Sequence, residues 1–182
     1  SWAGLGFAKD LDQLGPVRIC VVAINLVVGF LFLSRKPLVA AASWKALAVS
    51  VPSFLIGGFA FRLGHEHHPW PALWTGIFVV ATVFVIASLF FLGRNFAILP
   101  ARRKISTRGP YRWIRHPIYF GEFWLVQACA MVQPHWFGWI LPCLLIPCLM
   151  WRILAEEKLL AADEDYQIYR EKVRWRLLPG IW

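Results

Sequence analysis

A short segment of this chain combines cationic, imidazole and carboxylate side chains directly before an apolar run. Its sequence is GPYRWIRHPIYFGEF, residues 109–123. Pro117 suits the first position of a helix, because its missing N–H is not needed there, and this places His116 at the cap. Gly121 permits close backbone approach, and Glu122 falls in the first turns. Free N–H groups and partial positive charge at the helix N-terminus predict that this site attracts a carboxylate or a phosphate.

A second group of charged residues follows the last apolar run. Arg152 and Glu156 lie four residues apart, hence on one face of a helix, and Glu157 lies about 100° further round. Acidic side chains at the mouth of a membrane span are suited to hold an ammonium or a sulfonium. The region of His116, reinforced by Arg115, suits an anion. The two groups together describe a zwitterionic ligand, similar to an amino acid, with an additional positive centre.

Membrane helices are the elements that must position these residues. The 182 residues are 59% hydrophobic, include 11 Trp and have a mean hydropathy of +0.57, which excludes a soluble domain of this length. A bilayer core takes about 20 helical residues to cross, and fewer when flanking side chains reach the interface. The uncharged or nearly uncharged apolar runs are Val17–Leu33, Trp44–Phe61, Leu73–Leu92, Ile118–Val132 and Trp136–Trp151. We predict an all-α polytopic integral membrane protein with about five transmembrane helices, in which the last two runs are alternatively a re-entrant hairpin.

Basic residues predict the orientation of these spans. Three Lys/Arg belong to the first loop when Lys45 at the start of the second run is included, seven to the third loop and six to the segment after the fifth run, which is 16 of the 19 in the chain. Basic residues near span ends stay cytoplasmic, so we expect the third loop (residues 93–116) and the tail inside and the N-terminus outside. The formal net charge of +9 then indicates contact with an anionic inner leaflet, because the chain has no recognisable nucleic-acid-binding fold.

The residues after the fifth run form an amphipathic pattern. Apolar and aromatic side chains recur at helical spacing between charges, at Leu159, Leu160, Tyr166, Tyr169 and Val173. We predict one cytoplasmic amphipathic helix over about Arg152 to Arg174, ended by the Pro-Gly pair at 179–180. The chain is then a single membrane domain, residues 1–182, in which residues 1–92 shape the substrate pocket and residues 93–182 form the cofactor-binding and catalytic region.

One further cluster of metal-binding side-chain types lies between the second and third runs, at His65, Glu66, His67 and His68. Three imidazoles and a carboxylate are suitable ligands for a transition metal. The order HEHH differs from the HExxH helix pattern, however, and the loop lies on the opposite side of the membrane from the predicted ligand site. We therefore expect a solvated loop and no metal.

Four segments occur in order over about residues 93–180: NFAILPARRKISTRGPYRWIRHPIYFGEF, WRILAEEKLL, DEDYQIYREKV and the terminal LLPG. Together they resemble the isoprenylcysteine carboxyl methyltransferase family and the related membrane phospholipid methyltransferases. The resemblance is specific because the GxYxxxRHPxY block and the EE pair occur in this order, separated by a hydrophobic hairpin. It implies a methyltransferase within the membrane that takes S-adenosyl-L-methionine from the cytosol and a lipophilic acceptor from the bilayer.

The same resemblance implies which residues contact the cofactor. The matching positions are Tyr111, His116, Pro117, Ile118, Tyr119 and Glu156, and the loop before them contributes Arg103, Lys104, Ile105 and Ser106. Arg103 and Lys104 depart from the more neutral residues common there. Arg115 and Glu157 flank the matching positions and complete the predicted cofactor site. The arginine four residues before the first glutamate contributes to the acceptor side, which implies Arg152 as a substrate-binding residue.

The predicted reaction is a direct displacement, in which the enzyme positions the two partners and excludes water. We expect Arg152, Glu156 and Glu122 to be the catalytic residues. Arg152 is suited to orient a carboxylate through paired hydrogen bonds, and a carboxylate acceptor needs no general base. An amine acceptor has to be deprotonated, with Glu122 or Glu157 as candidate bases.

These residues favour carboxyl O-methylation of an isoprenylcysteine-like acid or of another isoprenoid or lipid acid. The alternatives are a phospholipid-type N-methyltransferase, a membrane reductase of the sterol-reductase type that uses NADPH, and a non-catalytic membrane protein of the same fold. The short chain, the EE pair and the terminal LLPG favour methyl transfer over reduction. The expected partners are membrane lipids and a lipophilic or lipidated substrate, with no nucleic acid and no obligate protein partner.

Overall fold

The computed structural model describes residues 15–34, 44–66, 70–93, 105–132 and 136–182, and this part of the chain is all helical. Its elements are α2 (Pro16–Ser34), α3 (Trp44–Glu66), α4 (Ala72–Leu92), the 3₁₀ helix η3 (Gly109–Arg112), α5 (Pro117–Met131), α6 (Phe137–Leu160) and α7 (Glu164–Lys172). Each of the five predicted apolar runs coincides with one helix from α2 to α6. The predicted all-α class is therefore confirmed for the described residues.

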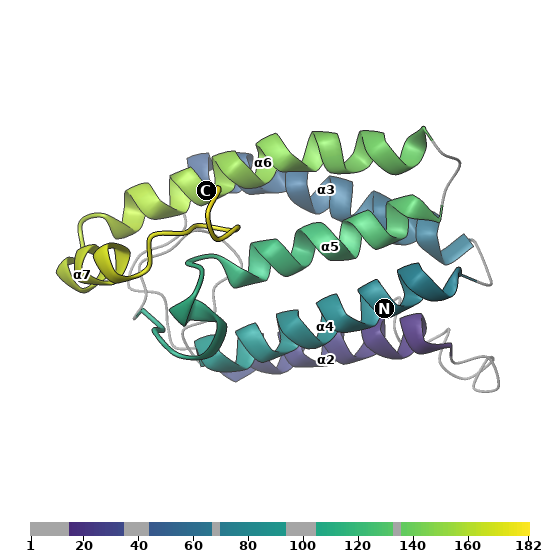
Figure 1. Ribbon diagram of the computed structural model, residues 1–182, viewed down its shortest axis with the longest axis horizontal. Coiled ribbons are helices and arrows are strands. Elements are labelled where there is room, and N and C mark those ends of the chain that lie inside the picture. The colour runs from purple at the N-terminus through teal and green to yellow at the C-terminus, as the bar shows by residue number, and fades with distance from the viewer. Residues whose placement is uncertain (1–14, 35–43, 67–69, 94–104, 133–135) are drawn as a thin grey trace.

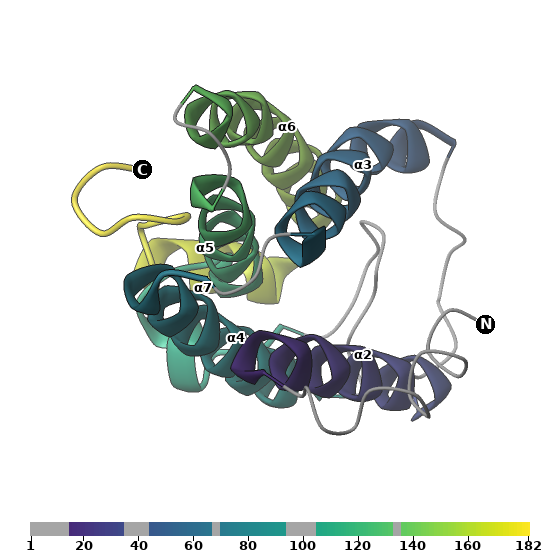
Figure 2. The ribbon, with the colours of Figure 1, turned by 90° about the vertical axis from the view of Figure 1, so that its right-hand side faces the viewer.

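The five long helices run side by side along the long axis of the molecule (Figure 1). Seen along that axis, α2 and α4 form one side and α3, α5 and α6 form the other, with α5 in the middle (Figure 2). Helix α5 accordingly packs against α4, α6 and α3, while α2 packs against α4. The short α7 and the segment that leads into α5 lie at the same end of the bundle (Figure 1). That end brings together the two charged segments that the sequence separates.

Three of the described helices are long and apolar enough to cross a membrane: Pro16–Ser34, Ala72–Leu92 and the Gly138–Leu160 part of α6. Helix α3 contains a shorter apolar stretch, Ala48–Gly64. Helix α5 has 15 residues and a length of about 22 Å, which is less than the thickness of a typical bilayer core. The predicted count of five spans therefore stays a prediction.

The predicted single amphipathic helix from Arg152 to Arg174 is wrong in its bounds. Helix α6 continues without a break through the last apolar run to Leu160, and the chain turns before α7 begins. Asp163 is the N-cap of α7, and its side chain accepts a hydrogen bond from the backbone N–H of Asp165 at 3.0 Å. Because aspartate favours N-caps over helix interiors, Asp163 starts a new helix there. Arg152 and the glutamate pair thus belong to α6.

Close packing between α4 and α5 depends on Gly121. A Cβ atom added at this glycine would collide with Cγ2 of Val85 on α4. Gly121 therefore lets the first turns of α5, which carry the predicted site residues, lie directly on α4. The close backbone approach predicted for this glycine is made to a neighbouring helix. The largest fully buried side chains among the described residues include Phe78, Leu89 and Leu145.

Candidate functional site

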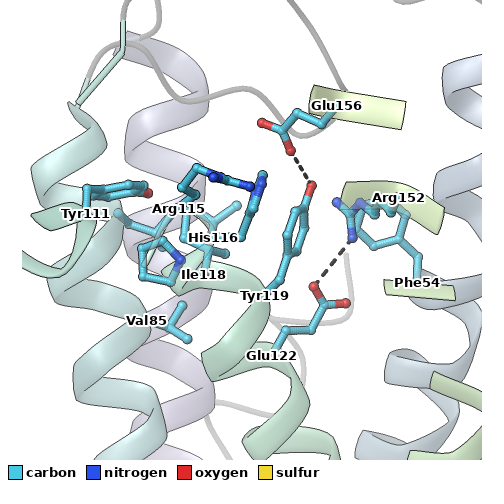
Figure 3. A pocket seen from close by; sticks show the side chains of 13 residues that line it. Phe54, Val85, Tyr111, Arg115, His116, Ile118, Tyr119, Glu122, Arg152 and Glu156 are labelled. Atoms are coloured by element: carbon cyan, nitrogen blue, oxygen red, sulfur yellow. Dashed lines mark hydrogen bonds and ion pairs between the residues drawn. The ribbon is translucent and has the colours of Figure 1, made fainter. Parts of the chain in front are cut away.

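A cavity of about 320 Å³ lies where α5 and α6 meet the other three long helices (Figure 3). Its apolar wall comes from α2, α3 and α4, and its polar wall comes from the start of α5 and the end of α6. The lining residues are Val28, Phe54, Val85, Leu89, Tyr111, Arg115, His116, Pro117, Ile118, Tyr119, Glu122, Arg152 and Glu156. This volume falls at the lower end of the range of small-molecule sites, about 300–1,000 Å³. The cavity thus joins a charged end to an apolar end.

The start of α5 has the predicted geometry. His116 is the N-cap residue, and Pro117 occupies the first helical position. The backbone N–H of His116 donates to the carbonyl of Arg176 at 2.9 Å, and that of Arg115 donates to the carbonyl of Trp175 at 2.9 Å. The imidazole of His116 makes no capping hydrogen bond to α5. The C-terminal segment therefore fixes where α5 begins.

Glu156 presents a buried carboxylate to the cavity. Its side chain accepts a hydrogen bond of 2.8 Å from the hydroxyl of Tyr119, and the residue is only 2% exposed. The ring of Tyr119 stacks on His116, with 5.6 Å between ring centroids. Figure 3 shows the Tyr119 hydroxyl directed at Glu156. Because buried charges need partners, this arrangement keeps an anionic group in a defined place beside the cavity.

Arg152 and the four residues around its guanidinium form what we call the cavity arginine cluster: Arg152, Ser53, Phe54, Tyr119 and Glu122. Nη1 of Arg152 donates to Oγ of Ser53 at 3.1 Å and lies 3.4 Å from Oε2 of Glu122. The guanidinium carbon lies 4.4 Å from the ring centroid of Phe54 and 4.8 Å from that of Tyr119. Arg152 is 5% exposed, yet it lines the cavity. The cluster therefore places a cation between the apolar wall and the buried Glu156.

A second buried group forms what we call the tail arginine cluster: Arg115, His116, Glu157, Arg176 and the carbonyls of residues 173 and 174. Oε1 of Glu157 accepts from Nε of Arg115 at 2.9 Å and lies 3.2 Å from Nε2 of His116. Oε2 of Glu157 accepts from Nε of Arg176 at 3.0 Å. Nη1 of Arg115 donates to both tail carbonyls, at 3.0 and 3.1 Å. Glu157 thus ties α6, the start of α5 and the C-terminal segment together.

A smaller cavity of about 30 Å³ adjoins the first and shares Tyr111 with it. Ile105 and Ser106 line it, opposite two tyrosines of α7. The hydroxyl of Tyr169 donates to the carbonyl of Tyr111 at 2.7 Å, which fixes η3 against α7. Burial raises the pKa of Tyr166 and of Tyr169 above the usual value, so both hydroxyls are protonated near neutral pH.

Most of the predicted site residues come together in this region. The larger cavity collects Tyr111, Arg115, His116, Pro117, Ile118, Tyr119, Glu122, Arg152 and Glu156, and the smaller one adds Ile105 and Ser106. Glu157 is the exception, because it does not line either cavity and instead faces the C-terminal segment. Arg103, Lys104 and the side chains of His65, Glu66, His67 and His68 lie outside the described residues.

Several residues of the site carry no signal that sequence reasoning had used. Ser53 and Phe54 sit in an apolar run, where neither a serine nor a phenylalanine distinguishes a site from ordinary packing. Tyr166 and Tyr169 stand out in the sequence only as part of an amphipathic pattern, although their spacing of three places both on one helix face. Arg176 lies beyond the predicted helix, and only its basic side chain marked it.

Residues 72–167, more than half of the chain, match the family model described as phospholipid methyltransferase. The chain belongs to the phospholipid methyltransferase family. The predicted resemblance to the membrane methyltransferases is therefore confirmed. No curated protein matches the chain. Membership of the phospholipid methyltransferase family indicates a membrane methyltransferase that acts on lipid, and the three long apolar helices agree with an integral membrane location.

The match to the phospholipid methyltransferase family covers all of the polar wall of the larger cavity. It begins at the start of α4 and ends within α7, so it includes η3, α5 and α6. Helices α2 and α3 lie before it. The family match therefore does not cover the part of the cavity contributed by these two helices.

Proposed function

We propose that this protein transfers a methyl group from S-adenosyl-L-methionine to the carboxylate of a lipophilic acid. The observation that carries the proposal is the position of Arg152, which lies in one cavity between buried Glu156 and an apolar wall. An isoprenylcysteine-like acid, or another isoprenoid or lipid acid, fits such a cavity, because its carboxylate would meet Arg152 and its apolar chain would lie along the apolar wall. The family match favours methyl transfer over the sterol-reductase alternative.

The residues of the polar wall fit the methyl donor. S-adenosylmethionine would supply a methyl group on a positively charged sulfur, together with an ammonium and a carboxylate. The buried carboxylate of Glu156 is suited to attract the cationic groups, and the Tyr119 hydroxyl holds it in place. The first N–H groups of α5 have no acceptor within the helix and are suited to the carboxylate. Tyr111, Ile105 and Ser106 lie on the far side, where the smaller cavity continues the site.

Transfer to a carboxylate needs little chemistry from the protein. An oxygen of the acceptor forms the new bond to the methyl carbon while the methyl–sulfur bond breaks and its electron pair goes to sulfur. No proton has to be removed. Arg152 orients the acceptor carboxylate, and Glu122 and Ser53 hold that guanidinium in turn. Burial of the site excludes water, so that positioning supplies most of the rate enhancement.

Transfer to an amine, as in a phospholipid N-methyltransferase, is the second candidate. Glu122 favours it, because its carboxylate lines the cavity 3.4 Å from Nη1 of Arg152 and is suited to accept a proton. Glu157, the other predicted base, is engaged by Arg115, His116 and Arg176. An amine reaction would therefore use Glu122.

The proposal includes the topology predicted from charge. All five long helices cross or enter the bilayer, with the N-terminus outside. The end of the bundle that carries η3, α7 and the C-terminal segment faces the cytosol, where the cofactor is available. The basic residues of that end support this orientation. Attachment of a membrane-impermeant reagent to single cysteines placed in α7 and before α2 would test it in sealed vesicles.

One experiment separates the two acceptor classes. The full chain in lipid nanodiscs is incubated with methyl-labelled S-adenosylmethionine and either N-acetyl-S-farnesylcysteine or phosphatidylethanolamine. We expect base-labile labelled methyl ester with the acid and no labelled amine lipid. Labelled phosphatidylethanolamine would establish the amine reaction instead. Failure to bind S-adenosylhomocysteine, measured by calorimetry, would refute the cofactor assignment.

A further inference from the structure

Part of the apolar wall of the larger cavity comes from helices that precede the family-matched residues 72–167. Val28 of α2 and Phe54 of α3 line this wall. Ser53, next to Phe54, accepts the hydrogen bond from Arg152 of α6. The arginine that the proposed reaction needs is therefore held partly by α3.

The hydroxyl of Ser53 is oriented so that it accepts a hydrogen bond from Arg152. The residue is fully buried, and its O–H donates to the carbonyl of Ser50 at 3.0 Å. Because the proton is used there, the oxygen presents a lone pair to Nη1 of Arg152 at 3.1 Å. A hydrogen bond from a charged donor is stronger and more directional than a neutral one. Ser53 thus fixes one edge of the guanidinium.

Phe54 and Tyr119 restrict the guanidinium through its faces. The two rings flank Arg152 (Figure 3), with ring centroids 4.4 and 4.8 Å from its terminal carbon. Cations over aromatic rings at such distances are attracted to the ring electrons. Phe54 is also 42% exposed and lines the cavity, so one side chain contacts both the arginine and the space for the acceptor.

We propose that Ser53 and Phe54 are positioning residues that hold Arg152 in the orientation in which it meets the acid group of the acceptor. The inference rests on the proposed carboxyl methylation and assigns to α3 a part in selecting the acceptor. The apolar chain of the acceptor then lies beside Phe54 and Val28, because both line the cavity that Arg152 faces. Residues outside the segment that identifies the family therefore contribute to acceptor preference.

Chemical modification of Arg152 tests the geometry without any acceptor. The full chain in nanodiscs is treated with phenylglyoxal, and the modified fraction of Arg152 is followed by peptide mass spectrometry. We expect the rate to rise about fivefold in Ser53→Ala and in Phe54→Leu, and to recover in Ser53→Thr and Phe54→Tyr. Leu55→Ala, at a position of the same helix that is 68% exposed, is the matched control and leaves the rate unchanged.

Kinetics test the consequence for the acceptor. With N-acetyl-S-farnesylcysteine as the acid, kcat/KM should fall about tenfold in Ser53→Ala and about fivefold in Phe54→Leu. The affinity for S-adenosylhomocysteine should stay within about twofold of the wild type, because both side chains act on Arg152 and the hydrogen bond between Tyr119 and Glu156 is kept. Ser53→Thr and Phe54→Tyr should restore most of the loss.

Two results would overturn the inference. One is an unchanged rate of Arg152 modification in both Ser53→Ala and Phe54→Leu. The other is an equal loss of S-adenosylhomocysteine affinity, which would make α3 a support of the whole site rather than of the arginine. If the wild-type protein bound no S-adenosylhomocysteine, the proposed function would fail, whereas the modification rates would still decide whether α3 holds Arg152.

Discussion

Two arginine–glutamate pairs involve residues at or near the start of α5, and they differ in what surrounds them. In the tail arginine cluster the Arg115–Glu157 distance is 2.9 Å, and the two side chains are 4% and 9% exposed. In the cavity arginine cluster the Arg152–Glu122 distance is 3.4 Å, and Glu122 is 22% exposed. Only the cavity arginine cluster has both members of its ion pair on the wall of the larger cavity.

The partners of the two arginines explain this difference. Arg115 uses the carboxylate of Glu157 and two backbone carbonyls of the C-terminal segment, so its donors are committed to holding the chain together. Arg152 contacts side chains from α3 and α5, including two aromatic rings that tolerate a nearby ligand. We infer that the tail arginine cluster stabilises the site, whereas the cavity arginine cluster acts on the acceptor.

The largest expected effect is on stability, from Glu157→Ala. The substitution leaves Arg115 and Arg176 without their carboxylate, and removal of one partner from a buried ion pair costs about 3–5 kcal/mol. The free energy of unfolding, measured by denaturant titration in detergent, should fall by that amount. Glu171→Ala, at an exposed position of α7, is the control. A change of less than about 1 kcal/mol in Glu157→Ala would contradict the role given to the tail arginine cluster.

The second effect is on catalysis, from Arg152→Ala. We expect kcat/KM for N-acetyl-S-farnesylcysteine to fall about 100- to 1,000-fold, equivalent to about 3–4 kcal/mol of transition-state stabilisation. The affinity for S-adenosylhomocysteine, measured by calorimetry, should change little. Arg112→Ala, which removes an exposed arginine of η3, should keep full activity. Equal losses of acceptor and cofactor affinity in Arg152→Ala would remove the distinction between the two clusters.

The third effect should reach both clusters at once, through Gly121→Ala. The added methyl group collides with Val85 and pushes α5 away from α4, and such overpacking costs about 1–3 kcal/mol. Since α5 carries Tyr119 and Glu122 and begins directly after Arg115 and His116, stability and acceptor turnover should fall together. The double variant Gly121→Ala with Val85→Ala should recover part of both losses in the same assays. Recovery of neither would show that the contact with α4 does not position α5.

The sequence predicts the start of α5 better than it predicts the contacts within the two arginine clusters. The start of α5 was predictable because Pro117 has a fixed backbone preference and occupies the first helical turn. The residues alone predict that the region of His116 and the side chain of Glu156 bind one ligand, whereas the role of Tyr119 follows only from the family resemblance. The contact between Ser53 and Arg152 joins residues 99 positions apart, and a serine within an apolar run carries no local signal for it.

The sequence did not predict the tail arginine cluster, for a different reason. Glu157 was predicted to contact the cofactor because it follows Glu156, but its carboxylate lies on another face of α6 and meets Arg176. Its arginine partner, Arg115, is bound further by backbone carbonyls, and any residue type can supply those. Similarly, the end of α6 at Leu160 depends on Asp163 capping the next helix. Amphipathic spacing alone does not reveal such a break.

The smallest expected effect separates the cofactor side from both clusters. Tyr119→Phe removes the hydroxyl that donates to Glu156 but keeps the ring beside Arg152 and the stack on His116. A hydrogen bond to a charged acceptor contributes at least about 1.5 kcal/mol, so S-adenosylhomocysteine affinity should fall about tenfold. The KM for N-acetyl-S-farnesylcysteine should stay within about twofold, because the ring is what contacts the arginine. Calorimetry measures the S-adenosylhomocysteine affinity, and steady-state kinetics measures the acceptor KM separately. A rise in the acceptor KM without a loss of cofactor affinity would mean that the hydroxyl acts on Arg152. The Tyr119 hydroxyl would then belong to the acceptor side of the site and not to the cofactor side with Glu156.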